Sequence, residues 1–533
     1  MQPPPAWPER NAAHLLVSSE QMAALEQQLF ASGLPVEALM EKAALAITQR
    51  IQQQWGSYLA RHGAVVLVGP GHNGGDGLVI ARELHLAGIQ VAIWSPFERY
   101  KPLTERHLRH GLWLGIPRLQ EPPEPSGEAL WIDAVFGIGQ SRAPGVAIET
   151  LLAQRQAQRP HTLVAVDGPT GLCSNTGRLL GTTAACAHTT YAIGLLKTGL
   201  VQDPALAWVG QVERMELGLP APLLEQLPLE QPLGLEPGDH ATVPPLALNP
   251  AAGKYGRGRV LLLAGSDRYR GAAALSLLGA DASGCGSLRA ALPEAMASEL
   301  WRWLPHAVLQ RTLASDGAGN LSLAGLADAD LERLDALLLG PGIGCPQGGP
   351  SPEETAAWQR LQAFPGLLVL DADGLNRTNA AWLQRRRGPT WITPHAGEFT
   401  RLFPALTERP PLEAAAQAAC QSGAAVLLKG SHTVIAAPDG RRWQVMRSAP
   451  AAARTGLGDV LAGFAAGRGA MVLASGDRAD ACWLAAAALA HANAGLTLQQ
   501  QGRVPSPELI ARLLHCEDNR PREAATLSDK SCP

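Results

Sequence analysis

Cysteine is scarce in this chain, with eight residues among 533. The eight stand apart, and the sequence contains no C-x-x-C pair and no spacing typical of a metal site. This pattern argues against disulfide bonds and against a zinc site. We therefore expect reduced, mostly buried thiols.

Charged residues are also few. They make up 17% of the chain, the formal net charge is -3, and lysine and arginine are scattered with no long basic run. Nothing in this distribution favours nucleic acid or an anionic membrane surface as a partner. The 46% hydrophobic content is that of a soluble globular protein, for which small-molecule chemistry is the better expectation.

The chain shows no clear targeting or membrane segment. Its first residues, MQPPPAWPERNAAHLL, have prolines and charges where a signal peptide needs a basic start and an apolar stretch. The apolar segment CWLAAAALAHANAGL is interrupted by His491 and Asn493. We expect a cytoplasmic protein without a membrane partner.

The length implies two or more domains. The clearest boundary is a proline-rich stretch, where repeated prolines leave no room for a regular helix or a central strand. We predict a first domain over residues 1–218, a linker over 219–243, a second domain over 244–515 and a disordered tail over 516–533.

Both halves have the pattern of α/β domains. In the first half the apolar runs AVVLV, VAIW, ALWIDAVF and HTLVAVD alternate with helix-like stretches. The second half repeats this with RVLLLAG, ALLLGPG, GLLVLDAD, TWITP and AVLLKG before it ends in alanine-rich helices. Such alternation predicts parallel sheets covered by helices on both faces, in three-layer domains.

The loop GPGHNGGDG follows the first apolar run and matches the dinucleotide fingerprint G-x-G-x-x-G at Gly69, Gly71 and Gly74. Two features argue against a dehydrogenase. Ser95 ends the second run where a ribose-binding acid is expected, and Asp76 lies inside the loop, where its carboxylate would repel a pyrophosphate.

Polar residues follow the other strand-like runs of the first half. Asn73, Asp133 and Thr170 offer hard oxygens that suit a cation, and Asp167 and Lys197 could transfer protons. Each could instead serve structure, as a turn residue, a helix cap or a solvated lysine. Because ligands bind at the carboxyl ends of parallel strands, several such loops together favour a site.

In the second half, Gly456 and Gly458 precede Asp459 at the start of a long predicted helix. This turn offers backbone N–H groups for a phosphate and a carboxylate for a hydroxyl proton, a combination that suits phosphoryl transfer. A helix-capping turn is the alternative. The segments ALLLGPGIG, VLDADGLN, TPHAGEF and AVLLKGSHTV, each at or after a strand-like run, add weight to a site.

The motifs LMEKAA, GPGHNGGDG, DAVFGIG and VAVDGPTGL, with the Lys197 segment, resemble in order the NAD(P)H-hydrate epimerase domain over residues 15–218. The family loop usually reads N-N-G-G-D and its later motif D-I-P-S-G, so His72, Gly168 and Thr170 depart from the pattern. The resemblance implies a Rossmann-like domain in which Asn73, Asp133 and Thr170 hold a potassium ion and Asp167, assisted by Lys197, carries a proton. The implied substrate contacts are His72, Asn73, Gly74, Gly75, Asp76, Gly137, Ile138, Gly139, Gln140, Ser141, Arg142 and Ala143.

Residues 244–500 resemble the ADP- or ATP-dependent NAD(P)H-hydrate dehydratase of the ribokinase-like superfamily. The family motif G-G-S-G-D appears here with its final Gly-Asp intact and with Leu457 in place of serine. The resemblance implies that Asp459 is the catalytic base and that magnesium accompanies the nucleotide. The hydrate would contact Ala272, Gly342 and His395, and the nucleotide would contact Lys429, Gly430, Ser431, His432, Thr433 and Gly458.

Together the two resemblances imply one function, the repair of hydrated NADH and NADPH. The first domain would interconvert the R and S hydrates, and the second would dehydrate the S form at the expense of ADP or ATP. A homo-oligomer is also expected by resemblance. The alternative is a ribokinase-like kinase for a vitamin precursor, fused to a nucleotide-binding domain without catalytic activity.

Overall fold

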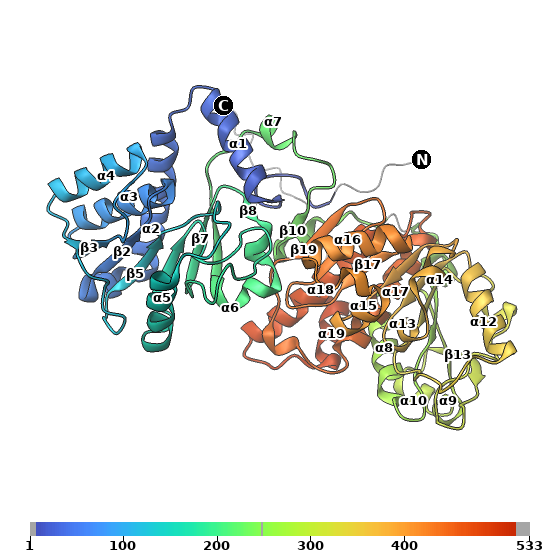
Figure 1. The fold of residues 1–533 in the computed structure, drawn as a ribbon. Coiled ribbons are helices and arrows are strands. Elements are labelled where there is room, and N and C mark those ends of the chain that lie inside the picture. The colour runs from blue at the N-terminus through green and yellow to red at the C-terminus, as the bar shows by residue number, and fades with distance from the viewer. Residues whose placement is uncertain (1–6, 247–248, 519–533) are drawn as a thin grey trace, which may run out of the picture. The chain divides into compact units, whose positions relative to one another are not determined.

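The structure is a computed structural model that describes residues 7–246 and 249–518 (Figure 1). The chain divides into two compact units. The N-terminal unit is Arg10–Gln231, and the C-terminal unit contains the other described residues, 7–9, 232–246 and 249–518. The division at residue 231 falls within the proline-rich stretch 219–243.

The N-terminal unit is built on a seven-stranded sheet in which every neighbouring pair is parallel. In spatial order the strands are β4 (Arg118–Leu119), β3 (Val91–Trp94), β2 (Ala64–Val68), β5 (Leu130–Ala134), β6 (Leu163–Val166), β7 (Thr189–Ile193) and β9 (Gln211–Met215). A separate parallel pair joins β1 (Leu16–Val17) to β8 (Leu196–Lys197).

Helices cover both faces of this sheet. The helices are α1 (Ser19–Ala31), α2 (Val36–His62), α3 (His72–Leu86), α4 (Pro102–Trp113), α5 (Val146–Gln158), α6 (Leu206–Val209) and α7 (Ala221–Leu224). Val65 and Leu67 of β2 pack against α5, whereas Val66 lies against Gly77 of α3. Alternation along one strand therefore supplies the cores on the two faces.

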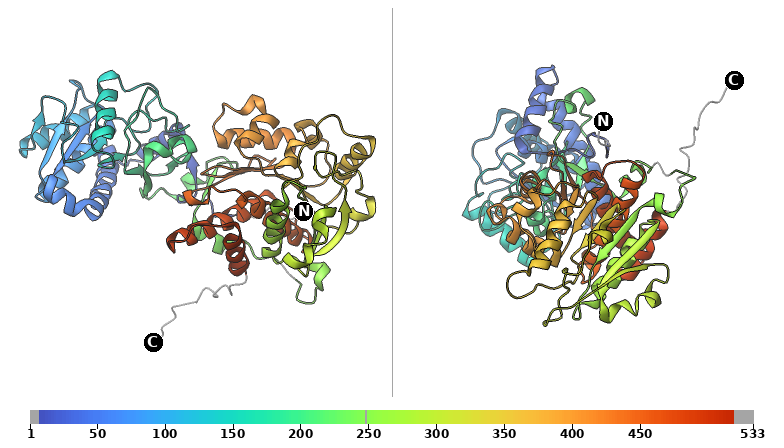
Figure 2. Two further views of the ribbon diagram at one scale, coloured as in Figure 1. Left: turned by 90° about the horizontal axis from the view of Figure 1, so that it is seen from below. Right: turned by 90° about the vertical axis from the view of Figure 1, so that its right-hand side faces the viewer.

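The C-terminal unit contains a ten-stranded sheet. Its strands are, in spatial order, β10 (Leu233–Leu235), β19 (Arg442–Val445), β18 (Val434–Ala436), β17 (Ala425–Leu428), β16 (Thr390–Ile392), β15 (Leu367–Leu370), β14 (Ala336–Leu339), β11 (Arg259–Leu263), β12 (Ser287–Pro293) and β13 (Val308–Leu313). Only β18 runs antiparallel to its neighbours. The yellow-green strands β11–β13 form one edge of the sheet (Figure 2). The predicted α/β class with parallel sheets is confirmed in both units.

Both short and long helices connect the strands of this unit. The helices are α8 (Arg270–Ala282), α9 (Glu294–Ala297), α10 (Leu300–Trp303), α11 (Asp328–Leu331), α12 (Pro352–Ala363), α13 (Asp373–Asn376), α14 (Ala380–Gln384), α15 (Ala396–Leu402), α16 (Pro411–Ser422), α17 (Leu457–Ala474), α18 (Ala481–Gln500) and α19 (Pro507–Asp518). A Cβ added at Gly463 of α17 would lie 1.9 Å from the Ser276 carbonyl oxygen of α8, so these helices meet backbone to backbone.

Two of these helices, α17 and α18, are long and apolar enough to span a membrane by composition alone. In the most apolar 18-residue stretch of each helix, 72% of the α17 residues and 67% of the α18 residues are buried inside the fold. Their hydrophobic character is therefore used to build the protein core.

The proline-rich stretch carries more structure than its composition predicts. It holds the single turn α7, the edge strand β10 and a 3-10 helix over Pro237–Thr242. Proline is tolerated in the first turn of a helix, and an edge strand can stand beside prolines because its outer N–H groups need no partner. Of the predicted disordered tail, residues 516–518 complete α19 and the others lie outside the described residues.

The start of the chain belongs to the C-terminal unit. Trp7 is 4% exposed, its indole N–H donates to the Asp239 carbonyl oxygen at 3.1 Å, and its own carbonyl accepts from Trp443 Nε1 at 2.9 Å. The six cysteines with described side chains are all free, as expected. The expectation of mostly buried thiols is wrong, because of these six only Cys482 is buried.

Candidate active sites

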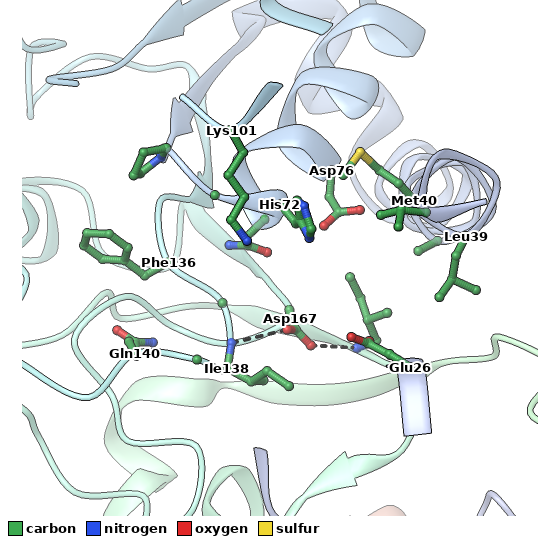
Figure 3. Close-up of a pocket in the computed structure, with 18 of the residues that line it drawn as sticks. Glu26, Leu39, Met40, His72, Asp76, Lys101, Phe136, Ile138, Gln140 and Asp167 are labelled. Atoms are coloured by element: carbon green, nitrogen blue, oxygen red, sulfur yellow. Dashed lines mark hydrogen bonds between the residues drawn. The ribbon is translucent and has the colours of Figure 1, made fainter. Parts of the chain in front are cut away.

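A cavity of about 400 Å³ opens in the N-terminal unit where β2, β5 and β6 end (Figure 3). Its walls come from α1, α2, the start of α3 and the loops after β5 and β6. It is lined by Glu26, Phe30, Val36, Leu39, Met40, Ala43, Pro70, Gly71, His72, Asn73, Asp76, Lys101, Val135, Phe136, Gly137, Ile138, Gly139, Gln140, Asp167 and Ile193. This is the strand edge at which a parallel sheet binds its ligands.

Asp167 is held rigidly in the cavity wall. Its Oδ1 accepts from Lys197 Nζ at 2.7 Å and from the Ile193 N–H at 3.2 Å, and its Oδ2 accepts from the Ile138 N–H at 3.3 Å. The Lys197 side chain is completely buried behind it, whereas 14% of the Asp167 side chain remains accessible. A lysine and two backbone amides thus fix the orientation of the Asp167 carboxyl group.

The backbone at Asp167 is in the left-handed region, with φ at +65°. Few residues other than glycine adopt this conformation, and such strain gathers at functional sites. The pairing of β1 with β8 fixes Lys197 opposite Val17, and from this position its Nζ reaches Asp167 Oδ1. The predicted proton-transfer pair is therefore a direct ion pair.

The glycine loop is shaped by close backbone packing. A Cβ at Gly69 would lie 1.6 Å from the Val135 carbonyl oxygen, and one at Gly74 would lie 2.0 Å from the Gly69 carbonyl oxygen. Gly71, by contrast, has no atom within 4 Å of its added Cβ and lines the cavity. The first amides of α3 have no side-chain cap, so this helix start can accept an anionic group of a ligand.

Asn73, Asp133 and Thr170 lie at the ends of three adjacent strands. Asp133 is wholly buried, and its two oxygens accept from the Thr170 hydroxyl at 2.8 Å, the Thr170 N–H at 2.8 Å and the Val135 N–H at 3.3 Å. Burial raises the Asp133 pKa to about 6, and the bonds from Thr170 and Val135 oppose that rise. When the Asn73 amide is oriented so that both of its polar atoms have partners, its Nδ2 donates to the Val166 carbonyl at 3.2 Å and its Oδ1 accepts from the Gly137 N–H at 3.3 Å.

Two further carboxyl groups face the same cavity. Asp76 of α3 is 8% exposed, and burial, followed by the charges of Asp167 and Glu26, raises its pKa well above the usual value. Burial and Asp167 likewise raise the pKa of Glu26 of α1 to about 7, against the opposing effect of Lys197. Neither Glu26 nor Lys101 was predicted from the sequence. A Glu four residues after the buried Met22 was the available signal for the first.

The other predicted substrate contacts are placed in two ways. Gln140 lines the cavity and ties the two loops together, because its Oε1 accepts from the Gly171 N–H at 2.7 Å and its Nε2 donates to the Pro169 carbonyl at 2.9 Å. Some predicted contacts are not among the described residues that line the cavity. Gly74 and Gly75 are buried in the first turn of α3, and Ser141, Arg142 and Ala143 continue the exposed loop after Gln140.

The C-terminal unit gathers charged groups where α17 begins. Gly456 precedes the helix with φ at +90°, and Asp459 stands in the first turn. Burial is the main reason that the Asp459 pKa rises to about 7, and the charge of Asp371 adds to it while Lys429 opposes it. A Cβ at Gly458 would lie 3.6 Å from Lys429 Nζ, so the predicted base and lysine share one site.

Lys429 lies between carboxylates. Its Nζ is 2.7 Å from Asp371 Oδ1 and 3.9 Å from Glu398 Oε2. Burial would lower the Lys429 pKa, but the charges of Asp371 and Glu398 outweigh it and raise that pKa. Asp371, which is 2% exposed and also accepts from the Thr393 hydroxyl at 2.7 Å, was missed by the sequence analysis although its segment was noted.

His395 has a structural task as well as a place near this cluster. It caps α15, with Nδ1 accepting from the Gly397 N–H at 3.0 Å and Nε2 lying 3.2 Å from Glu398 Oε1. Its backbone N–H donates to Glu398 Oε2 at 2.9 Å, and the side chain remains 59% exposed. A bridge between the backbones of His395 and Lys429 joins the ends of β16 and β17.

The remaining predicted contacts lie in two loops. Gly342, with φ at +65°, packs on the start of α8, where its added Cβ would lie 2.7 Å from the Ala272 Cβ. Gly430, Ser431, His432 and Thr433 form the turn between β17 and β18, closed by the bond from the Thr433 hydroxyl to the Gly430 carbonyl at 3.2 Å.

Family models match both units of the chain. Residues 36–199 match the YjeF-related protein N-terminus, and residues 260–515 match NAD(P)H-hydrate dehydratase. The bifunctional NAD(P)H-hydrate repair enzyme Nnr of Synechocystis sp. is 41% identical over 496 residues, which cover 91% of each chain. The chain belongs to this family of bifunctional NAD(P)H-hydrate repair enzymes.

A second relative of the same name, from Gloeobacter violaceus, is 42% identical to this chain over 457 residues, which cover 84% of this chain and 87% of the relative. Among solved structures, the ADP/ATP-dependent NAD(P)H-hydrate dehydratase from Bacillus subtilis, co-crystallized with ATP and Mg²⁺, is 25% identical with a TM-score of 0.42. It covers 53% of this chain and 95% of its own.

Membership of the family confirms the function predicted from the sequence, an epimerase domain joined to an NAD(P)H-hydrate dehydratase domain. The alternative, a vitamin-precursor kinase fused to a non-catalytic domain, is not favoured.

Proposed function

We propose that the cavity of the N-terminal unit epimerises hydrated NADH and NADPH, and that the Asp459 cluster of the C-terminal unit dehydrates the S epimer with ADP or ATP. The observation that carries this assignment is the ion pair of Asp167 with the buried Lys197 at the wall of the cavity. It places an oriented carboxyl group beside a space of about 400 Å³.

In the epimerase step, the hydroxyl group leaves the ring carbon as the ring nitrogen forms a double bond to that carbon. Water then adds to the opposite face. Asp167 takes the proton of the incoming water and its negative charge favours the cationic ring that forms transiently. Lys197 keeps the carboxylate oriented by its 2.7 Å bond. The amides at the start of α3 and the side chain of Lys101 would provide positive charge for the substrate phosphates. Burial, followed by the charge of Lys101, lowers the pKa of His72, so His72 would serve as a neutral hydrogen-bonding group.

Asn73, Asp133 and Thr170 are the proposed potassium site. Their donors are all oxygens, which suit a hard monovalent cation. Every hydrogen bond that the structure gives the buried Asp133 carboxyl comes from a neutral donor, so a cation would compensate its charge. When bound, the ion would hold the loops after β2, β5 and β6 together.

In the dehydratase step, Asp459 removes the proton of the S-hydrate hydroxyl as its oxygen attacks the terminal phosphoryl group of the nucleotide. Phosphate then leaves the ring carbon, a proton leaves the neighbouring carbon, and the reduced nicotinamide is restored. Lys429 and the first amides of α17 would face the transferred phosphoryl group, because the Lys429 Nζ lies beside Gly458 at the start of this helix. No group of three or more His, Cys, Asp or Glu side chains in the described residues could hold a metal, so magnesium would arrive with the nucleotide phosphates.

NMR of a purified R hydrate tests the assignment without interference from the second site. With enzyme and potassium but no nucleotide, the S signal should grow faster than in a protein-free control, and replacement of potassium by lithium should slow it. Growth at the control rate would overturn the epimerase assignment, and an unchanged rate in lithium would overturn the cation site. The homo-oligomer, the cytoplasmic location and the absence of a nucleic-acid partner stay predictions.

A further inference from the structure

A carboxyl group lies on the apolar face of α1, where it meets the epimerase cavity. Met22 is buried one helical turn before Glu26, and Phe30 lies one turn after it and lines the same cavity. Glutamate rarely leaves water without an ion-pair partner. The half-buried position of Glu26 at the cavity therefore costs free energy, which suggests that its carboxyl group has a use there.

Within the described part of the chain, no hydrogen bond or ion pair reaches the Glu26 carboxyl. The other ionisable groups that line the cavity are Asp167 after β6, His72 and Asp76 of α3, and Lys101 (Figure 3). Lys197 lies behind Asp167. Asp167 is bonded by three donors, whereas Glu26 is free to bond a ligand. Two carboxyl groups thus share one cavity in opposite environments, a pattern typical of an acid and a base.

We propose that Glu26 is a second catalytic residue of the epimerase, the acid that works with Asp167 as base. This inference rests on the function proposed above. Glu26 gives its proton to the departing hydroxyl, the carbon–oxygen bond breaks, and the ring nitrogen supplies the electron pair for the new double bond. A water molecule adds to the other face and passes its proton to Asp167. In the reverse reaction the two carboxyl groups exchange roles.

The choice between Glu26 and Asp76 follows from accessibility and charge. Asp76 is 8% exposed, and burial raises its pKa well above the usual value, so it is poorly placed to exchange a proton with a ligand or with water. Glu26 is half-buried, and burial together with Asp167 raises its pKa to about 7. An acid that must gain and lose a proton in each cycle works best near the operating pH. Asp76 instead offers the ligand a fixed hydrogen bond.

The test uses the full-length enzyme with a mixture of both hydrates, potassium, magnesium and ADP or ATP. Near-ultraviolet absorbance should rise in two phases, a rapid one as the S hydrate is dehydrated and a slower one limited by epimerisation of the R hydrate. Glu26→Gln should leave the first phase unchanged and slow the second by about 100-fold or more, toward the protein-free rate. Glu20→Gln makes the same change on an exposed residue of the same helix and should leave both phases unchanged.

The pH profile distinguishes a catalytic role of Glu26 from a structural one. The second phase of the wild type should slow as pH rises through about 7, where Glu26 loses its proton, and this limb should be absent in Glu26→Gln and retained in Glu26→Asp. A Glu26→Gln variant within threefold of the wild type, or one that keeps the limb, overturns the proposal. A wild-type second phase no faster than the protein-free control would overturn the epimerase function itself.

Discussion

Each unit places a lysine-paired carboxyl group in the same site as a second carboxyl group, for which the described residues provide no ion pair. In the N-terminal unit Lys197 holds Asp167, and Glu26 has a pKa of about 7. In the C-terminal unit Lys429 holds Asp371, and Asp459 has a pKa of about 7. The lysines differ, because Lys197 is completely buried whereas 22% of the Lys429 side chain is accessible.

This difference in accessibility of the two lysines indicates that the two ion pairs serve different purposes. A sealed lysine can only orient its carboxylate, which suits a site that moves protons. A lysine open to the site can also meet a ligand anion, which suits a site that transfers a phosphoryl group.

The largest effect is expected from a change at Asp459. Asp459→Asn removes the proposed base, and we expect the dehydratase rate to fall by about 10²- to 10⁴-fold. Absorbance recovery from pure S hydrate measures it. Epimerisation followed by NMR in the same variant is the control and should stay at the wild-type rate. A dehydratase rate within tenfold of the wild type would contradict the assignment.

Asp167→Asn leaves the buried Lys197 without a counter-charge. We expect the free energy of unfolding to fall by about 3–5 kcal/mol, since an unpaired buried charge is costly. Urea denaturation measures this loss. The double variant Asp167→Asn/Lys197→Met should recover most of the stability but no epimerase activity. Recovery of both would show that the pair has only a structural role.

The corresponding double variant in the other unit, Asp371→Asn/Lys429→Met, removes a pair that also faces the ligand. We expect a stable protein whose KM for the nucleotide rises by about 10- to 100-fold, because a charge-assisted bond is lost. Initial rates at varied ADP or ATP give this value.

The single variant Lys429→Met tests whether the Lys429 charge sets the pKa of Asp459. The Lys429 charge lowers the Asp459 pKa, so its loss should raise that pKa further. Because Asp459 acts as a base when ionised, the wild-type dehydratase rate should increase as pH rises through about 7, and this limb should move to higher pH in the variant. An unmoved limb would separate Lys429 from Asp459.

The smallest effect is expected for stability at Asp76. Its folded-state pKa is raised above the unfolded value, so the folded state binds more protons and the free energy of unfolding falls as pH rises above the unfolded pKa. Asp76→Asn has no such loss and should be more stable than the wild type at pH 8. The gap should shrink at pH 5, as thermal melts at both pH values can show.

Much of the fold was predictable because buried parallel strands appear as short apolar runs, such as AVVLV of β2 and ALLL of β14. The glycine and aspartate residues after those runs pointed to the strand ends where the sites lie. The start of the chain was less predictable, since nothing near Trp7 in sequence shows that it packs against Asp239 and Trp443 of the C-terminal unit.

The sites were predictable in their segments but less in their pairings. Asp167 and Lys197 were singled out separately, and their 2.7 Å bond depends on the pairing of β1 with β8. Asp371 could not be told from Asp373, because Lys429 lies 58 residues further along the chain. Glu26 resembles any solvated helix residue until the cavity beside α1 is known.

The most direct test of the account is the extent of NADH or NADPH recovery when the enzyme meets both hydrate epimers with potassium, magnesium and ADP or ATP. Two sites acting in series on one substrate predict complete recovery, faster than spontaneous epimerisation in a protein-free control allows. Recovery of the S fraction alone, with the R fraction left to the spontaneous rate, would contradict it.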